Sequence, residues 1–84
     1  MSYKDTDIVR NSDNGIAWIL RDTRRGMYVV MIQTITHSIS CCGFSLDDEG
    51  LSKANATADR IDSWSNEKAS RVILNLELNR ARGT

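Results

Sequence analysis

The spacing of apolar residues changes near residue 46, and this change divides the 84-residue chain into two parts. Before it, apolar and β-branched residues alternate, as they do in strands, where successive side chains point to opposite faces. After it, Ala, Leu, Glu, Lys and Arg recur at spacings of three and four, which is typical of amphipathic helices. Strands followed by helices predict an α+β fold. We therefore expect one domain over residues 1–84, with a β-sheet part at 1–46 and a helical part at 47–84.

Turn signals divide the first part into strands. Asn14-Gly15 and Thr23–Gly26 are typical of turns, because Gly and Asn adopt positive φ readily, and His37-Ser38 could close a tight hairpin. Three strands are expected between these turns, over residues 16–22, 27–36 and 39–46. Residues 5–10 are a candidate fourth strand at the edge. The sequence thus predicts a three- or four-stranded antiparallel sheet.

The predicted pairing, with Asp22 opposite Met27 and Thr36 opposite Ile39, assigns each side chain to one of two sheet faces. The first face would carry Ile16, Trp18, Leu20, Val29, Met31, Cys42 and Phe44. The opposite face would carry Ala17, Ile19, Arg21, Tyr28, Val30, Ile32, Thr34 and Cys41. We expect the first face to form the core. The second face is more apolar than a solvated face should be, and we expect it to stay uncovered.

Two helices are expected after residue 46, over residues 49–63 and 67–82. The apolar stripe of the first consists of Leu51, Ala54, Ala58 and Ile61. Asp47 or Asp48 can cap its N-terminus. The stripe of the second consists of Ala69, Val72, Ile73 and Leu76, widened by Leu74, Leu78 and Ala81. Because the connections are short, both helices should pack on one face of the sheet.

The charge balance limits the partners. Eleven Lys and Arg residues match eleven Asp and Glu residues, so the formal net charge is zero, which argues against a general polyanion binder such as a nucleic-acid protein. The longest strongly apolar run, residues 27–32, is far shorter than the ~20 residues that cross a bilayer. No apolar signal segment begins the chain. We therefore expect a cytoplasmic protein that does not use a membrane.

The residues that carry chemistry are few. His37, Cys41 and Cys42 are ligand types that suit zinc, but structural zinc takes four ligands. Adjacent cysteines on a strand should also point to opposite faces. Helix capping explains the acidic run at residues 47–49. Since no nucleophile stands beside a base and an orienting group, we expect a non-enzymatic protein with neither metal nor cofactor.

The run Gly43-Phe44-Ser45, followed by an acidic, Ala-spaced stretch that ends Ala58-Asp59-Arg60, resembles plant ethylene-response-factor DNA-binding domains. It is also similar to the arm-type DNA-binding domains of tyrosine recombinases. The resemblance implies a three-stranded sheet in the major groove, backed by a helix. It would place on the groove face Arg21, Tyr28, Val30, Ile32 and Thr34. Only one of these is basic, whereas the families present several Arg, Lys or Trp residues.

In size and element order the chain also resembles small bacteriophage inhibitor proteins, including those of the anti-CRISPR type. This resemblance implies a protein-binding module that occludes a host protein complex. The alternative is a small DNA-binding or regulatory domain of the three-stranded-sheet-plus-helix type. The predicted partner-binding surface is the second sheet face with its arginine rim, namely Arg21, Arg24, Arg25, Tyr28, Val30 and Ile32. Two copies could also pair through this face as a homodimer.

Overall fold

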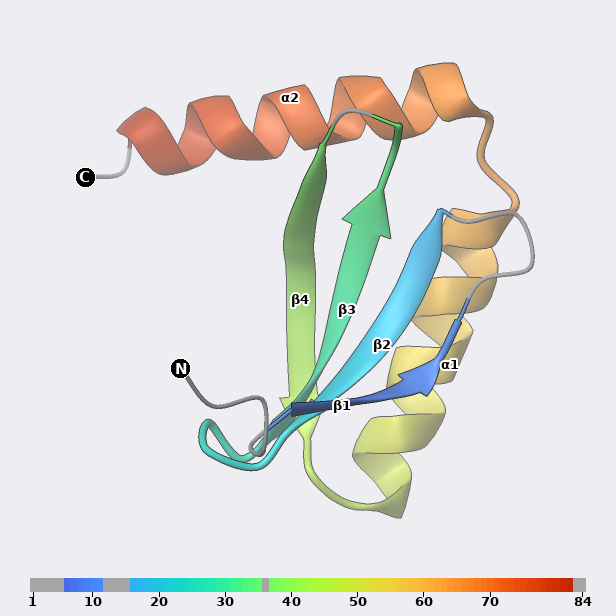
Figure 1. Ribbon diagram of the computed structural model, residues 1–84, viewed down its shortest axis with the longest axis vertical. Helices are drawn as coiled ribbons and strands as arrows, with labels where there is room; N and C mark the ends of the chain where they lie inside the picture. The colour runs from blue at the N-terminus through green and yellow to red at the C-terminus, as the bar shows by residue number, and fades with distance from the viewer. Residues whose placement is uncertain (1–5, 12–15, 36, 83–84) are drawn as a thin grey trace.

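A computed structural model describes residues 6–11, 16–35 and 37–82 and shows a four-stranded antiparallel sheet followed by two helices (Figure 1). The strands are β1 (Thr6–Arg10), β2 (Ala17–Asp22), β3 (Met27–Gln33) and β4 (Ser38–Ser45). The helices are α1 (Asp48–Asp62) and α2 (Asn66–Arg82). The strands lie in the order β1-β2-β3-β4. The predicted α+β fold is confirmed, including the edge strand, whereas Asp5 and the Asn14-Gly15 turn lie outside the described residues.

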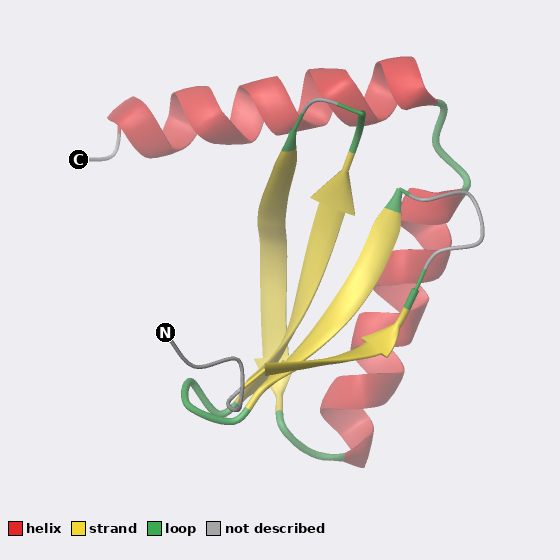
Figure 2. Ribbon diagram, in the orientation of Figure 1, coloured by secondary structure: helices red, strands yellow, loops and turns green. Residues whose placement is uncertain are grey.

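The two helices occupy different places. Helix α1 lies along one face of the sheet, and α2 crosses the end of the sheet near the β3–β4 connection (Figure 2). Asp47 caps α1, as expected, because its carboxylate accepts hydrogen bonds from the Gly50 N–H at 2.7 Å and the Ser45 hydroxyl at 2.9 Å. These two bonds favour the charged form and lower the pKa of Asp47.

The sheet face that α1 covers is not the one predicted. Ile19, Val30 and Ile32 are 0% exposed and belong to one buried cluster with residues of both helices. The cluster consists of Ile16, Ala17, Ile19, Val30, Ile32, Ile39, Ala54, Ala58, Ile61, Ala69 and Ile73. Among the residues predicted to form the core, Ile16 and Val29 are buried, whereas Trp18, Leu20 and Met31 are only partly buried. Small and branched side chains make a surface that a helix can approach closely, which explains the choice of face.

Pairing in the sheet is partly as expected. The β2–β3 register is confirmed, with Asp22 opposite Met27. The predicted β3–β4 register is wrong, since Met31 pairs with Ser40 and not with Phe44. The cause is the position of the reversal: β3 ends at Gln33, which pairs with Ser38, and the Thr34 N–H donates to the His37 carbonyl at 2.7 Å, so the chain turns two residues earlier than predicted. His37-Ser38 is therefore no tight hairpin turn, and Thr36, the predicted partner of Ile39, lies outside the described residues.

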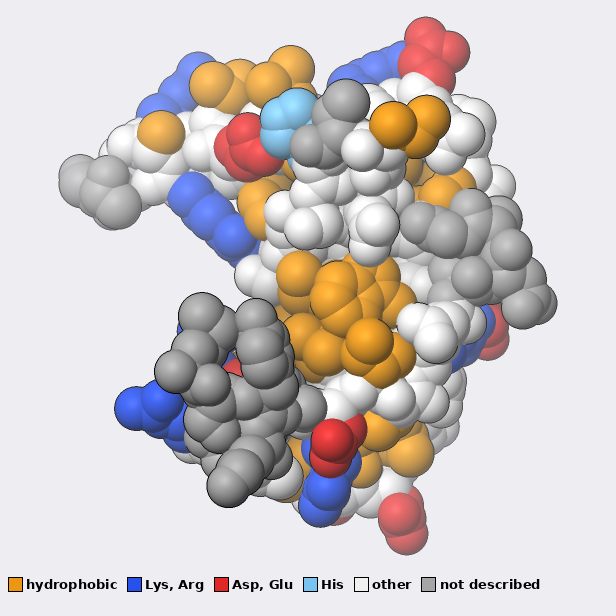
Figure 3. Space-filling view, viewed as in Figure 1, with side chains coloured by type: hydrophobic (Ala, Val, Ile, Leu, Met, Phe, Trp, Pro, Cys, Tyr) orange, Lys and Arg blue, Asp and Glu red, His pale blue; other side chains and the backbone are white. Residues whose placement is uncertain are grey.

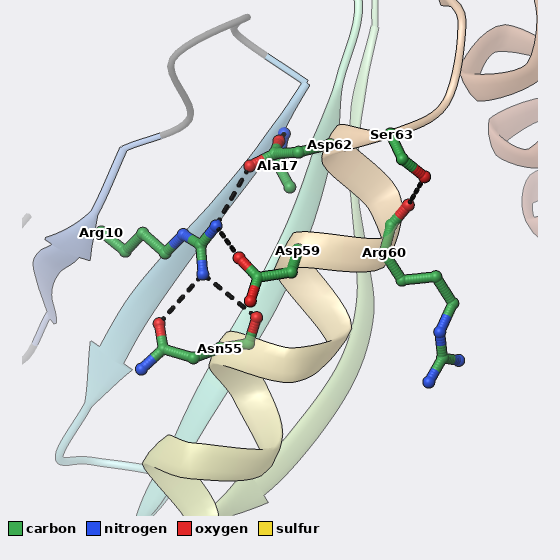
Figure 4. A network of polar contacts seen from close by, with 7 residues as sticks. All are labelled: Arg10, Ala17, Asn55, Asp59, Arg60, Asp62 and Ser63. Carbon is green, nitrogen blue, oxygen red and sulfur yellow. Dashed lines mark hydrogen bonds and ion pairs between the residues drawn. The ribbon is translucent and has the colours of Figure 1, made fainter.

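A polar clasp from Arg10 joins β1 to α1 (Figure 4). Ile8 pairs with Leu20 but Arg10 pairs with Ile19, so Val9 is an extra residue that turns Arg10 toward the helix side. The guanidinium donates to Asp59 at 2.6 Å, to Asp62 at 3.2 Å and to the backbone and side-chain oxygens of Asn55. The bond to Asp59 is the main reason that the pKa of Arg10 is raised. The other carboxylate oxygen of Asp62 accepts the Ala17 N–H at 3.1 Å.

The assignment of faces predicts different costs for two neighbouring residues of β3. Ile32→Ala should lower the free energy of unfolding by about 2–5 kcal/mol, because it empties space in the core. Met31→Ala should cost less, about 1–2 kcal/mol, because this side chain is only partly buried on the other face. Urea unfolding followed by circular dichroism measures both. A larger cost for Met31→Ala would contradict the observed faces.

The clasp predicts that Arg10→Ala loosens β1. The variant leaves Asp62 without its cation, and the expected cost is about 1–3 kcal/mol, at the low end because Asp59 is largely exposed. In the variant, backbone amides of β1 should exchange with solvent faster than they do in the parent, and this increase should be larger than the increase for β3. Arg24→Ala, in the exposed β2–β3 turn, is the control and should change stability by less than about 0.5 kcal/mol. Equal effects of the two variants would argue against the clasp.

Candidate protein-interaction surface

The structure separates the residues of the predicted partner-binding surface. Val30 and Ile32 are buried beneath α1, and Tyr28 packs against the same cluster. The predicted docking face, and a homodimer through it, are therefore wrong, because the helix occupies that face. The groove face implied by the DNA-binding resemblance contains the same buried residues and is excluded for the same reason.

The three predicted arginines stay near the surface but do not act as one group. Arg24 and Arg25 are exposed in the β2–β3 turn. Arg25 donates its backbone N–H to Asp22 at 3.1 Å and places its Nε 3.5 Å from the same carboxylate. Arg21 lies 3.8 Å from Asp7 across the β1–β2 pair. Two of the three arginines thus have acidic neighbours on their own sheet.

The other side of the sheet carries an apolar surface that sequence reasoning had assigned to the core. Register places Leu20 between Ile8 and Val29, and Trp18 beside Met31. In the described part of the chain neither helix covers this side, and Figure 3 shows an apolar patch at its centre. We call this surface the uncovered face and define it by Ile8, Trp18, Leu20, Val29 and Met31. Ile8 is exposed, Trp18, Leu20 and Met31 are partly buried, and Val29 is buried.

Trp18 is the most distinctive group of the uncovered face. Its indole Nε1 is shielded from solvent and has no hydrogen-bond acceptor among the described residues. A shielded donor without an acceptor costs about 1–3 kcal/mol. Tryptophan is enriched at protein interfaces because it offers a large apolar ring and one donor. The same indole is therefore both an apolar anchor and an unused donor.

Gly43 extends the apolar surface toward β4. A Cβ atom at this position would lie 2.7 Å from the sulfur of Met27, so the Met27 side chain passes over the glycine. Register places Gly43 opposite Val29, on the same side as the uncovered face. Methionine is flexible and polarisable, and it adapts to irregular partner surfaces. At the same end, the Asp22–Arg25 pair supplies a charged rim.

A β-bulge brings the two cysteines to the same side of the sheet. The β3–β4 register shifts between Val30 and Met31, which leaves Cys41 as an extra residue on β4. Cys41 and Cys42 both pack against the buried cluster, so the prediction that they point to opposite faces is wrong. Burial, together with the neighbouring Cys41, raises the pKa of the Cys42 thiol to about 11. Among the described residues no three His, Cys, Asp or Glu side chains group as a metal site.

His37 lies in a pocket of about 240 Å³ between α2 and the β3–β4 connection. Thr34, Ser70 and Glu77 line the same pocket, which brings together four polar side chains from α2 and the β3–β4 connection. The sequence carried no signal of this grouping, because α2 follows His37 by almost thirty residues. Ile73 and Leu74 supply its apolar wall.

Comparisons with protein-family models, curated proteins and solved structures find no match for this chain. Within the described residues, neither helix has the length and apolar character needed to cross a membrane. The function is therefore argued from the surface itself.

The raised pKa predicts slow alkylation of Cys42 in the folded protein. With a pKa of about 11, roughly one thiol in a thousand is ionised at pH 8, against about a quarter for an ordinary cysteine. In the Cys41→Ser variant, which isolates Cys42 and keeps burial, the main cause of the raised pKa, iodoacetamide should react at pH 8 more slowly than in urea. Mass spectrometry follows the reaction. Equal rates in the folded and unfolded protein would contradict the shielding of this thiol.

Proposed function

We propose that this protein is a non-enzymatic protein-binding module and that the uncovered face is its docking surface. The observation that carries the proposal is the apolar side of the sheet that neither helix covers in the described part of the chain, where Trp18, Leu20 and Met31 are partly exposed. Folded monomers seldom expose an apolar patch of more than a few hundred Å² unless it binds something. Burial of such a patch yields about 25 cal/mol for each Å² removed from water.

The chemistry of the uncovered face indicates which kind of partner would bind it. The apolar centre fits a partner that presents aliphatic or aromatic side chains, since an apolar core inside a polar rim is the usual build of an interface. Because the Trp18 Nε1 is buried, the indole would meet the partner through its apolar ring and not through this donor. Trp18 is therefore the expected hot spot, and Met31 and Met27 the adaptable surroundings.

A protein partner fits this face better than a nucleic acid does. None of its five defining residues is basic. Nucleic-acid affinity depends mainly on phosphate neutralisation by Lys and Arg, and the zero net charge of the chain supplies no long-range attraction. The face lies on a sheet held by α1, so it is presented as a rigid surface.

We propose that its biological role is that of a small inhibitor of the kind made by bacteriophages, including anti-CRISPR proteins, and that it acts in the cytoplasm. Such an inhibitor occludes a functional surface of a host protein complex by binding it. Support comes from the α+β architecture and from the apolar surface that neither helix covers in the described part of the chain.

Photo-crosslinking from the uncovered face tests the proposal. A photo-reactive amino acid at Met31 should capture a defined host protein, and the same amino acid at Ala56, exposed on α1, should not. The captured protein is then purified and its affinity measured. The Leu20→Asp, Met31→Asp double variant should bind at least about 100-fold more weakly, because it places two charges in the interface. Ala56→Asp is the matched control.

Circular dichroism confirms that both variants are folded before binding is compared. If the double variant is folded and binds the purified partner as tightly as the Ala56→Asp control, the uncovered face is not the docking surface. Met31→Lys alone provides the same comparison if the double variant does not fold.

A further inference from the structure

Strand β4 is an edge strand whose own residues carry no charge, although a β-bulge at Cys41 and Arg80 of α2 lie along it. It forms one border of the sheet, and its sequence, Ser-Ile-Ser-Cys-Cys-Gly-Phe-Ser, contains neither a charged residue nor proline. Native edge strands are commonly short or carry Lys, Pro or other charges that prevent a further strand from adding. The opposite border, β1, follows this rule: it has five residues and includes Asp7 and Arg10.

The backbone groups of β4 that face outward can be assigned from one contact. The Ser40 carbonyl accepts a hydrogen bond from Arg80 of α2 at 2.5 Å, so this carbonyl faces the open edge. Backbone groups alternate in direction along a strand, and the extra residue at Cys41 shifts the alternation by one. The outward-facing positions are therefore Ser38, Ser40, Gly43 and Ser45.

These four positions are self-complementary. They are placed symmetrically about the Cys41–Cys42 peptide, so an antiparallel second copy can set Ser40 opposite Gly43 of the second copy. The same register sets Ser38 opposite Ser45 of the second copy. Every outward-facing residue of β4 then meets another, as an interface with two-fold symmetry requires.

Helix α2 projects beyond the same edge. Its C-terminal half extends past β4, and residues 77–82 are exposed. Leu74 is 56% exposed and Leu78 is 48% exposed. Leu76 packs against the buried cluster, and Leu74 borders the pocket at His37, so Leu78 is the apolar side chain that this half of α2 leaves toward a second copy.

Charge favours the same arrangement. Antiparallel pairing brings the start of one β4 beside the end of the other. Arg80 shows that the basic last turn of α2 lies at the start of β4, and the acidic first turn of α1 begins three residues after its end. Arg80 and Arg82 of one copy would thus approach Asp48 and Glu49 of the other, twice in the dimer. Opposite charges placed this way select partner and register.

We propose that two copies of this chain pair antiparallel through β4 to form a continuous eight-stranded sheet. Arg80 covers the Ser40 carbonyl in the single chain and is displaced when the second strand adds. The two-fold axis stands perpendicular to the sheet, so the uncovered faces of both copies lie on the same side. The pairing uses a different surface from the docking face and stands independently of it.

Sedimentation velocity of the full chain tests the pairing. The parent should be dimeric at about 100 μM, and Ser40→Lys should raise the dissociation constant at least about tenfold by placing a charge at the edge. Ala56→Lys adds the same charge on the exposed side of α1 and should leave the dimer intact. A parent that stays monomeric up to about 100 μM, or a folded Ser40→Lys that dimerises like Ala56→Lys, would overturn the proposal.

A charge-reversal cycle tests the register without altering β4. Asp48→Lys and Arg82→Glu should each weaken the dimer about two- to fivefold, and the double variant should recover most of the loss. Single losses that simply add in the double variant would show that these charges do not meet, and would overturn the register. This comparison remains valid if Ser40→Lys fails to fold.

Discussion

The close approach of α1 to the middle of the sheet is the contact on which the rest of the structure depends. Ala54 and Ala58 of the helix and Ala17 of β2 are completely buried, so no large side chain separates helix from strands at these points. In a chain of 84 residues this is the main opportunity to bury a core. Because α1 can cover only one face of the sheet, the opposite face, which carries Trp18, remains available for a partner.

Alternation alone could not decide which face becomes the core, because both faces of this sheet are apolar. The β2–β3 register follows from the Thr23–Gly26 turn and was predictable, and so were the two helices from their spacing. The large side chains of Trp18 and Phe44 favoured the wrong face. A better signal was present: an alanine stripe on a helix requires a flat sheet surface of small and branched residues, which the Ala17 face provides.

The two bulges explain the remaining differences. An extra residue leaves no mark in a pattern of apolar alternation, yet it reverses every side chain beyond it. The extra residue at Val9 turns Arg10 toward α1, where it forms the clasp, and no sequence motif predicts this contact. The extra residue at Cys41 brings both cysteines and Phe44 to the helix side. The uncovered face was missed because its residues were assigned elsewhere, and the pocket at His37 because it depends on the path of α2.

The order of the strands has a consequence for how the chain folds. Every strand pairs with its neighbour in sequence, so the hairpins close short loops at small entropic cost and can form early. The clasp between Arg10 and α1 spans 45 to 52 residues and joins the first strand to a helix made much later. The clasp should therefore form after the strand pairs, once α1 has docked on the sheet. Until then β1 is held by its pairing with β2, which makes the N-terminal edge the natural starting point of local unfolding.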